Sequence, residues 1–521
     1  MQHPLKKVLL GSFLLLSFLT GSAEASPKIL YVPLDNRPVC LEYTADTAKA
    51  AGYPLTTPPV KDLSDHRGSG DNEALWKWLE ENAPHADAAI LSTDSLNYGG
   101  LVASRRHHHL EKYLKDKVNR LVKLKKDNPG LKIYAFSTIM RTPQQSIGKV
   151  EPDYYQTYGP IIFKLSQLQD KEDQNGSLTY NEVVERQRLL AQIPAKIYQD
   201  WRTRRLMNFQ TNKRLIRLCQ NGIFHYLALG KDDDAPLSQT HMEARHLQYV
   251  GSGITQNRFQ ILPGVDQIGM LLITRAINEL RGDTPKIYTT FAPGAGGSTV
   301  PPYSDETAEQ SVHNQIIASG SQETNHFNQA DLVLAVNTSE DGVGRDSTSD
   351  NNAPYPSKNN RAFARAIAGW EKQKPVALAD ISYANGADNG FMLALTDAKA
   401  LLGLTAYSGW NTADNSIGFA LSQGILSESM KKDPAARERL LKTRLLDDWI
   451  YQANVRYRIS LLIEQEDFKL KYDLGKYYNK ILSATNRLMH QYVADEPTLK
   501  GTSYFMEFPW NRMFEVDVKV K

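Results

Sequence analysis

The sequence has little cysteine and little net charge, and both shortages exclude classes of function. Its 521 residues include two cysteines, Cys40 and Cys219, which are too few for a zinc site built on cysteine ligands. They lie far apart in the chain, and the sequence leaves open whether they form a disulfide or remain buried thiols. A formal net charge of +3 gives no reason to expect a nucleic-acid partner.

Motifs of several enzyme classes are also missing. The glycine-rich stretch APGAGGSTV at 292–300 contains neither a GxGxxG pattern nor a following Gly-Lys-Ser/Thr. No Gly-x-Ser-x-Gly elbow occurs. His241 and His246 are five residues apart, which misses the spacing of helical zinc pairs. We therefore expect no nucleotide loop, no serine-hydrolase elbow and no histidine metal pair.

Long hydrophobic runs are absent after the first 25 residues. Lys6 and Lys7 precede an apolar run from Val8 to Leu19, and Ala23-Glu24-Ala25 has the pattern of a signal-peptide cleavage site. We predict a signal peptide at 1–25 and an exported protein, periplasmic or secreted. No integral membrane segment is expected after cleavage.

Short β-rich runs alternate with amphipathic helical patterns along the chain, which predicts an α/β protein with a mainly parallel sheet. The ten candidate strands are Lys28–Leu34, Tyr53–Thr57, Ala86–Ser92, Lys132–Thr138, Ile223–Leu229, Arg258–Leu262, Lys286–Phe291, Leu332–Asn337, Val376–Asp380 and Leu404–Tyr407.

Ten strands exceed the eight of a closed barrel. We expect an α/β domain at 26–428 that forms a (β/α)8-like barrel with accessory strands. The alternative is two doubly wound parallel-sheet halves that meet near Pro263. Residues 151–221 carry no strand candidate and predict a helical excursion, and 429–521 predict a mostly helical C-terminal region. Both architectures place functional residues at the carboxyl ends of strands.

Polar side chains follow many of the candidate strands. Asp and Asn also cap helices and form turns, so any single position has a purely structural explanation. Arginine, tyrosine and tryptophan are not capping residues, and their presence favours a ligand crevice. The predicted substrate-binding residues are Asp35, Arg37, Asp94, Tyr98, Arg105, Arg141, Asp266, Asp380, Trp410, Asn411 and Asn415.

The triplet Asp232-Asp233-Asp234 follows the fifth candidate strand. On an exposed loop three carboxylates are harmless, whereas in a crevice they raise one another's pKa. One protonated acid beside one ionised partner then suits acid–base catalysis, so Asp232 and Asp233 are the predicted catalytic pair. Alternatively, these oxygens bind Ca²⁺ or Mg²⁺ together with Asp94 and Asp266. Their spacing does not choose between these uses.

Six blocks of the sequence together resemble a bacterial family catalogued as domain of unknown function 4127. The blocks extend from about residue 28 to 516, and the resemblance implies shared structural features but no particular reaction. They read VPLDNRPV, TDSLNYGGLVASR, DDDAP, PGVDQIGMLLITRA, YSGWNTADNSIG and PWNRMFE.

The adjacent aspartates and the late Trp/Asn cluster are also similar, at a few positions only, to retaining N-acetylhexosaminidases. That similarity implies that Asp232 orients the acetamido group of the substrate and Asp233 protonates the leaving group. Trp410 and Asn411 would shape the sugar pocket. The surrounding residues do not match the motif of those enzymes, and Asp234 adds a charge that they lack.

Three functions follow as hypotheses. The first is an exported glycosidase-like hydrolase of a glycan or cell-envelope sugar, which needs no cofactor. The second is a periplasmic binding protein in which Arg37, Arg105 and Arg141 anchor a small anionic ligand. The third is a hydrolase of phosphate or ester bonds that holds a divalent cation through Asp35, Asp94, Asp232 and Asp266.

Overall fold

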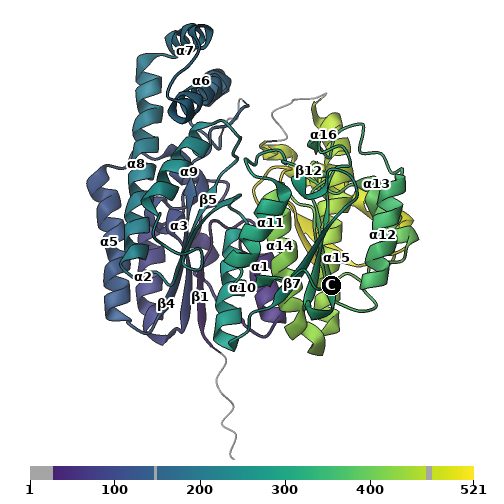
Figure 1. The fold of residues 1–521 in the computed structure, drawn as a ribbon. Helices are drawn as coiled ribbons and strands as arrows, with labels where there is room; N and C mark the ends of the chain where they lie inside the picture. Colours follow the sequence, from purple (N-terminus) through teal and green to yellow (C-terminus); the bar gives the residue numbers. More distant parts are fainter. Residues whose placement is uncertain (1–26, 146–148, 465–471) are drawn as a thin grey trace, which may run out of the picture.

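Two open parallel β-sheets organise the chain (Figure 1), in a computed structural model that describes residues 27–145, 149–464 and 472–521. The predicted signal peptide lies outside the described residues. The first sheet has the order β2-β1-β3-β4-β5-β6. Its strands are β1 (Ile29–Val32), β2 (Leu55–Thr56), β3 (Ala88–Ser92), β4 (Lys132–Ile139), β5 (Tyr226–Lys231) and β6 (Phe259–Pro263).

The second sheet has the order β13-β11-β9-β7-β8. Its strands are β7 (Lys286–Phe291), β8 (Gln322–Glu323), β9 (Leu332–Asn337), β11 (Val376–Asp380) and β13 (Ala406–Ser408). The parallel α/β class is therefore confirmed, and each of the ten expected strand segments overlaps a strand.

The (β/α)8-like barrel expected from the sequence is not confirmed. Within the described residues, β6 pairs only with β5, and β7 pairs with β8 and β9, so the strands form two sheets and no closed ring. Helix α11 (Ala308–Ala318) packs against β6, where a closed ring would need a further strand. The chain passes from one sheet to the other after Pro263, as the alternative of two parallel-sheet halves expects.

Successive side chains of a strand point to opposite faces of its sheet, and this alternation explains the layers of the fold. Ala88 and Ile90 of β3 face the core between the two sheets, whereas Ala89 and Leu91 face the outer helices. The central layer contains α1 (Glu42–Ala50), α10 (Ile268–Arg281), α11 and α14 (Ala413–Leu426). The outer layers contain α2 (Asn72–Asn82), α5 (Glu111–Asp127), α8 (Ala195–Gln220) and α9 (Gln239–Val250) on one side and α12 (Lys358–Trp370) and α13 (Asn389–Asp397) on the other (Figure 1).

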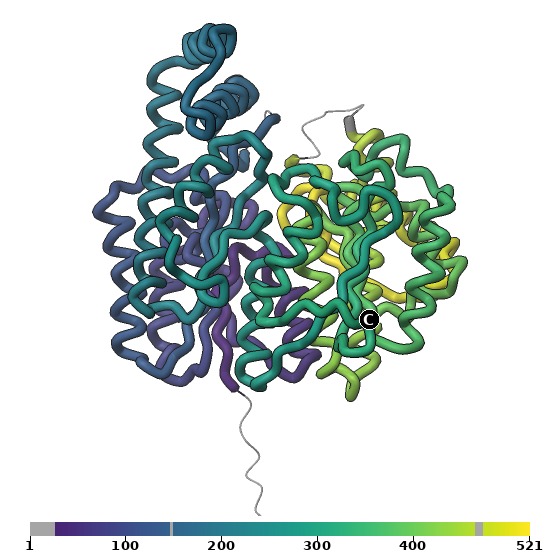
Figure 2. Tube along the Cα trace, in the orientation of Figure 1, coloured from purple at the N-terminus to yellow at the C-terminus, as the bar shows by residue number. Residues whose placement is uncertain are grey.

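Two further helical regions extend these layers. Between β4 and β5, α6 (Tyr155–Asn175) and α7 (Tyr180–Gln192) pack with the amino end of α8 as an arm that projects beyond the sheet (Figure 2). The C-terminal region contains α15 (Pro434–Arg444), a π-helix η6 (Leu445–Val455), α16 (Arg456–Glu464), α17 (Tyr478–Asp495) and the hairpin β14 (Tyr504–Glu507) and β15 (Asp517–Val520).

The remaining elements are short: α3 (Thr93–Tyr98), α4 (Leu101–Arg106), β10 (Arg345–Asp346), β12 (Tyr383–Ala384) and the 3-10 helices η1 (Val60–Asp62), η2 (Ala83–His85), η3 (Gly296–Ser298), η4 (Phe327–Gln329), η5 (Ser427–Lys432) and η8 (Gly475–Tyr477). None of the helices in the described ranges has the length and hydrophobicity of a membrane span. Cys40 and Cys219 are both free and buried, so the disulfide that the sequence left open does not form.

Candidate functional site

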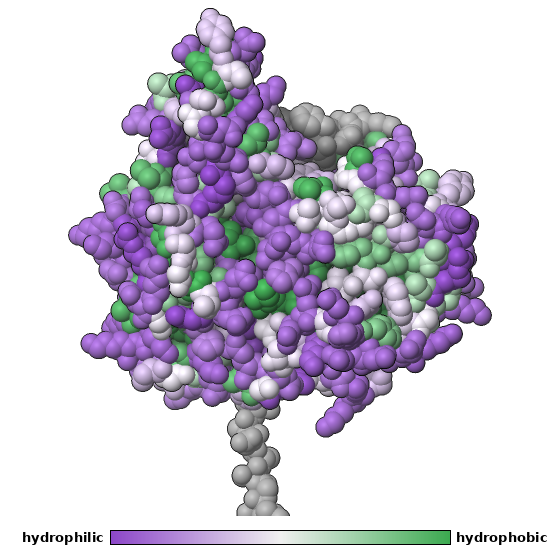
Figure 3. Space-filling view, in the orientation of Figure 1, coloured by the Kyte–Doolittle hydropathy of each residue, from purple (hydrophilic) through white to green (hydrophobic). Residues whose placement is uncertain are grey.

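A cavity of about 810 Å³ lies between the two halves, where loops after strands of both sheets meet. The carboxyl ends of parallel strands are the usual place for ligand sites in open α/β folds, and this volume suits a small ligand. Figure 3 shows a largely hydrophilic surface on one face of the molecule, with apolar side chains in smaller groups. The cavity is therefore the candidate functional site.

One side of the cavity is built by the first sheet, and we call it the ion-paired wall. Its residues are Asp35 and Arg37 after β1, Arg105 in α4, Arg141 after β4, Asp232 and Asp233 after β5, and Asp266 after β6.

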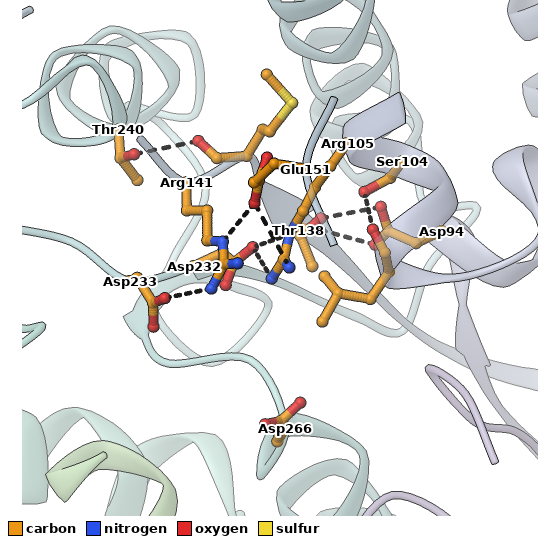
Figure 4. Close-up of polar contacts among 12 residues, drawn as sticks. Asp94, Ser104, Arg105, Thr138, Arg141, Glu151, Asp232, Asp233, Thr240 and Asp266 are labelled. Carbon is orange, nitrogen blue, oxygen red and sulfur yellow. Dashed lines mark hydrogen bonds and ion pairs between the residues drawn. The ribbon is translucent and has the colours of Figure 1, made fainter. Parts of the chain in front are cut away.

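Arg105 and Arg141 form the centre of this wall (Figure 4). Arg105 donates to Oδ2 of Asp232 from Nε at 2.9 Å and from Nη2 at 2.6 Å. Arg141 donates from Nε to Glu151 at 2.7 Å and from Nη1 to Asp233 at 2.5 Å. The two adjacent aspartates thus pair with different arginines, and Glu151 lies between those arginines.

The charges of this cluster do not balance. Arg105 and Arg141 carry two positive charges, whereas Glu151, Asp232 and Asp233 carry three negative charges when all are ionised. Burial raises the pKa of Asp232, although Arg105 and Arg141 oppose that shift. Burial also raises the pKa of Glu151. The cluster therefore favours holding a proton on a carboxylate.

A second cluster follows β1 and β6. The Nε atom of Arg37 donates to both oxygens of Asp35, at 3.0 and 2.9 Å, and its Nη2 donates to Asp266 at 2.5 Å. One guanidinium again faces two carboxylates. Burial raises the pKa of Asp266 against the opposing effect of Arg37. Figure 4 shows Asp266 on a separate loop from Asp232 and Asp233, and all three line the same cavity.

Four residues that line the cavity have left-handed backbone conformations. Asp233, Tyr303, Asn385 and Asn411 line it and have φ values of 35°, 66°, 62° and 60°. A side chain with a Cβ atom rarely adopts such angles, and strain of this kind concentrates at functional sites. The turn at Asp233 is held by a hydrogen bond from the Asp234 N–H to the Tyr303 carbonyl at 3.0 Å.

The same turn separates Asp234 from its neighbours. Its Oδ1 accepts hydrogen bonds from the Ser238 hydroxyl at 2.7 Å and from the Ala235 N–H at 2.8 Å. Burial raises the pKa of Asp234 to about 7, and the nearby Asp305 adds to the shift. Asp232 and Asp233, the predicted catalytic pair, therefore contact the arginines, whereas Asp234 stabilises the loop.

The opposite side of the cavity is built by the second sheet, and we call it the amide wall. Its neutral hydrogen-bonding side chains are Thr348, Asn385, Asn411, Thr412 and Asn415, and the charged residues Asp346 and Arg456 line the same side. Asn411 Nδ2 approaches Asp266 at 3.4 Å across the cavity. The Thr412 hydroxyl and the Asn415 Oδ1 are buried and have no hydrogen-bond partner. Such atoms are costly to bury, so a bound ligand is a natural partner for them.

Four predicted binding residues are buried near the cavity without lining it: Asp94, Tyr98, Asp380 and Trp410. Asp94 accepts from the Thr138 N–H at 2.8 Å, and burial raises its pKa to about 7. Burial also raises the pKa of Asp380 to about 7. Tyr98 packs against His107 with the two rings tilted by 32° and a centroid distance of 4.7 Å.

Trp410 belongs to the central core instead of the cavity surface. Its ring centroid lies 6.1 Å from that of Phe514 and 6.5 Å from that of Phe419, and the residue is 2% exposed. The polar residues after Trp410 therefore surround a core anchor that fixes the loop carrying Asn411 and Thr412.

Sequence reasoning missed several residues of the site, because no candidate strand precedes them. Glu151 lies at the start of the helical excursion, and Arg456 and Trp510 belong to the C-terminal region. Trp510 donates from Nε1 to Asn36 at 2.7 Å, and its ring lies 5.7 Å from the Arg37 guanidinium. The only available signal was the PWNRMFE block, which contains Trp510.

Within the described part of the chain, no group of three or more His, Cys, Asp or Glu side chains is placed to hold a metal ion. The carboxylates of the ion-paired wall instead face guanidinium groups. The divalent cation of the third hypothesis stays a prediction.

A family model described as "Protein of unknown function (DUF4127)" matches residues 29–519, which confirms the resemblance of the six sequence blocks. The curated proteins contain no match.

Proposed function

The chain belongs to the DUF4127 family, and on that premise we propose a function from the cavity itself: an exported carbohydrate-active hydrolase that acts on a glycan or cell-envelope sugar. One observation carries this proposal. A single cavity has carboxylates in excess over arginines on one side and mostly neutral amides and hydroxyls on the other. Export rests on the signal-peptide pattern of residues 1–25.

The amide wall supports a sugar ligand. Asn385, Asn411 and Asn415 each offer a donor and an acceptor, which suits hydroxyl groups that do both. Tyr303 and Trp510 line the same cavity and supply aromatic surface for a sugar ring. The role in the sugar pocket that the sequence similarity gave to Trp410 passes in this proposal to Trp510.

The ion-paired wall supports acid–base chemistry, with the roles of the two aspartates reversed from the sequence expectation. Burial raises the pKa of Asp232, and Arg105 occupies only its Oδ2 atom. Asp232 can therefore donate a proton from Oδ1 to the leaving oxygen as the glycosidic C–O bond breaks. Asp233, which pairs with Arg141, acts as the carboxylate that orients or deprotonates the attacking group.

Substitution of the three adjacent aspartates tests this division. Full-length protein is incubated with aryl glycosides and bacterial envelope glycans, and products are identified by mass spectrometry. Asp232→Asn and Asp233→Asn should each reduce turnover by roughly 10²- to 10⁴-fold, because each removes a proton-transfer group. Asp234→Asn is the matched comparison and should lower turnover less than either, because the Asp234 carboxyl binds Ser238 and the Ala235 N–H within the loop. Unchanged turnover in both Asp232→Asn and Asp233→Asn would overturn the assignment.

A periplasmic binding protein is a second candidate, favoured by the two parallel sheets that flank one cavity. Its predicted anchors Arg37, Arg105 and Arg141 are already paired with carboxylates, which makes them poor anchors for an anion. Thermal stabilisation by a sugar that is never converted would favour this candidate. Turnover that is abolished by a chelator and restored by Mg²⁺, Mn²⁺ or Ca²⁺ would favour the metal-dependent hydrolase.

A further inference from the structure

Arg456 enters the cavity from an unusual helix. It follows the π-helix η6, which spans 11 residues, whereas π-helical segments are mostly single turns and often lie at functional sites. Asp448 of this helix accepts hydrogen bonds from the Gly409 N–H at 2.7 Å and from Arg444 at 2.6 Å. The Asp448 carbonyl accepts from the Ala387 N–H at 3.1 Å. The helix is thereby fixed to the loops after β11 and β13, and the position of Arg456 is fixed with it.

Arg456 differs from the other arginines of the cavity in its pairing. Arg37, Arg105 and Arg141 each contact a carboxylate within 3 Å. Arg456 is half-buried, donates from Nη2 to the Asn385 carbonyl at 3.3 Å and lies 5.3 Å from the Phe514 ring centroid. Within the described ranges no carboxylate lies at ion-pair distance from it. A half-buried guanidinium of this kind is suited to an anionic group.

Asn385 connects Arg456 to the loop that begins α14. The Asn385 N–H donates to the Asn411 carbonyl at 2.7 Å, and the next residue, Thr412, is the N-cap of α14. Thr412 makes no side-chain cap, and its hydroxyl is buried without a partner, as is Oδ1 of Asn415. The amino end of a helix favours negative charge. Arg456, Thr412 and Asn415 thus line the same cavity, and Asn385 connects Arg456 to the loop that begins α14.

Asp346 is the carboxylate that lines this part of the cavity, and its oxygens are already engaged. Its Oδ2 accepts from Asn385 Nδ2 at 2.7 Å. Its Oδ1 accepts from the N–H and the hydroxyl of Thr348, at 3.0 and 2.7 Å. Asp346 therefore has neutral hydrogen-bond partners of its own and forms no ion pair with Arg456.

We infer that Arg456, Thr412 and the amino end of α14 form a subsite for an anionic substituent, so that the substrate is an acidic sugar and not a neutral one. The inference rests on the proposed function and names its substrate class. The excess carboxylates of the ion-paired wall repel an anion, and Arg456 attracts it from the opposite wall. This polarity fixes the orientation of the sugar, with its acidic group on the amide wall and its scissile bond toward Asp232 and Asp233.

Equilibrium binding tests the subsite without requiring turnover. Calorimetry compares sugars of matched shape that differ in one carboxylate, glucuronic acid against glucose and galacturonic acid against galactose. The native protein should bind the acidic member at least roughly tenfold more tightly, since a charge-assisted hydrogen bond is lost with the neutral one. Arg456→Gln should remove this preference, and Arg456→Lys should keep part of it. Arg458→Gln, which changes an exposed arginine two residues away, is the control and should keep all of it.

Competition by inorganic phosphate is the second binding experiment. Phosphate that competes with the acidic sugar, and loses this ability in Arg456→Gln, also supports the subsite and identifies a phosphoryl group as its ligand. Equal affinity for acidic and neutral sugars, or no detectable binding of either, would overturn the inference. Equal loss of preference in Arg456→Gln and Arg458→Gln would overturn it as well. Binding that depends on Arg456, together with no hydrolysis of any acidic glycan, would instead refute the proposed hydrolase and leave the subsite standing.

Discussion

The two walls of the cavity contrast in how their polar groups are satisfied. On the ion-paired wall, Arg37, Arg105 and Arg141 all contact carboxylates, so each guanidinium has a partner without a ligand. On the amide wall, Thr412 and Asn415 keep buried polar atoms without partners. A preorganised charged cluster suits chemistry, because its groups need no rearrangement during reaction. Unpartnered neutral groups suit recognition, because a ligand completes their hydrogen bonds.

The largest expected effect comes from breaking the ion-paired wall. Arg105→Met leaves Asp232 buried without its closest partner, and removal of one member of a buried pair typically costs about 3–5 kcal/mol of unfolding free energy. Arg456→Met on the amide wall breaks no ion pair among the described residues and should cost less than about 1 kcal/mol. Urea unfolding of both variants measures the difference. Equal losses of stability would remove the contrast between the walls.

A smaller effect is expected from the buried acids behind each wall. Burial raises the pKa of Asp94 and of Asp380 from 3.8 to about 7, so between these values the folded state binds more protons than the unfolded state. The free energy of unfolding should therefore fall as the pH rises from about 4 to about 7. Asp94→Asn and Asp380→Asn should each flatten this dependence.

Thermal unfolding at several pH values between these limits, for the native protein and both variants, measures the slopes. If only Asp94→Asn flattens the pH dependence of stability, then Asp380, the buried carboxyl behind the amide wall, is ionised in the folded protein. Slopes that are unchanged in both variants would show that neither acid is held protonated.

Much of the fold followed from local sequence pattern, because buried parallel strands are short, continuous apolar runs. Two-residue strands such as β8 and β10 carry no such pattern, and the hairpin β14–β15 lies in a segment with helical neighbours. Closure of the sheet into a barrel is the part that is not confirmed, because the number of strands cannot decide between one ring and two open sheets, both of which alternate strands with helices. The cover of β6 by α11 is a long-range packing event with no local signature.

The candidate site was predictable where its residues follow strands directly. Asp35, Arg37, Asp232, Asp233, Asp266 and Asn411 all line the cavity for that reason. The pairing of Arg141 with Glu151 and the placement of Arg456 depend on loops and a π-helix, whose geometry the residue types do not reveal. Trp410 was assigned to the ligand because of its polar neighbours, whereas Phe419 and Phe514 bury it in the core.

Steady-state kinetics on a hydrolysed glycan test most directly the claim that one wall performs chemistry and the other holds the substrate. Asp232→Asn should lower kcat by roughly 10²-fold or more with little change in KM, because its proton transfer occurs in the transition state. Asn415→Ala should raise KM with little change in kcat, because its contact is present in both the ground and the transition state. Full kcat in Asp232→Asn, or a shift of the same parameter by both substitutions, would contradict the division of the cavity into two walls.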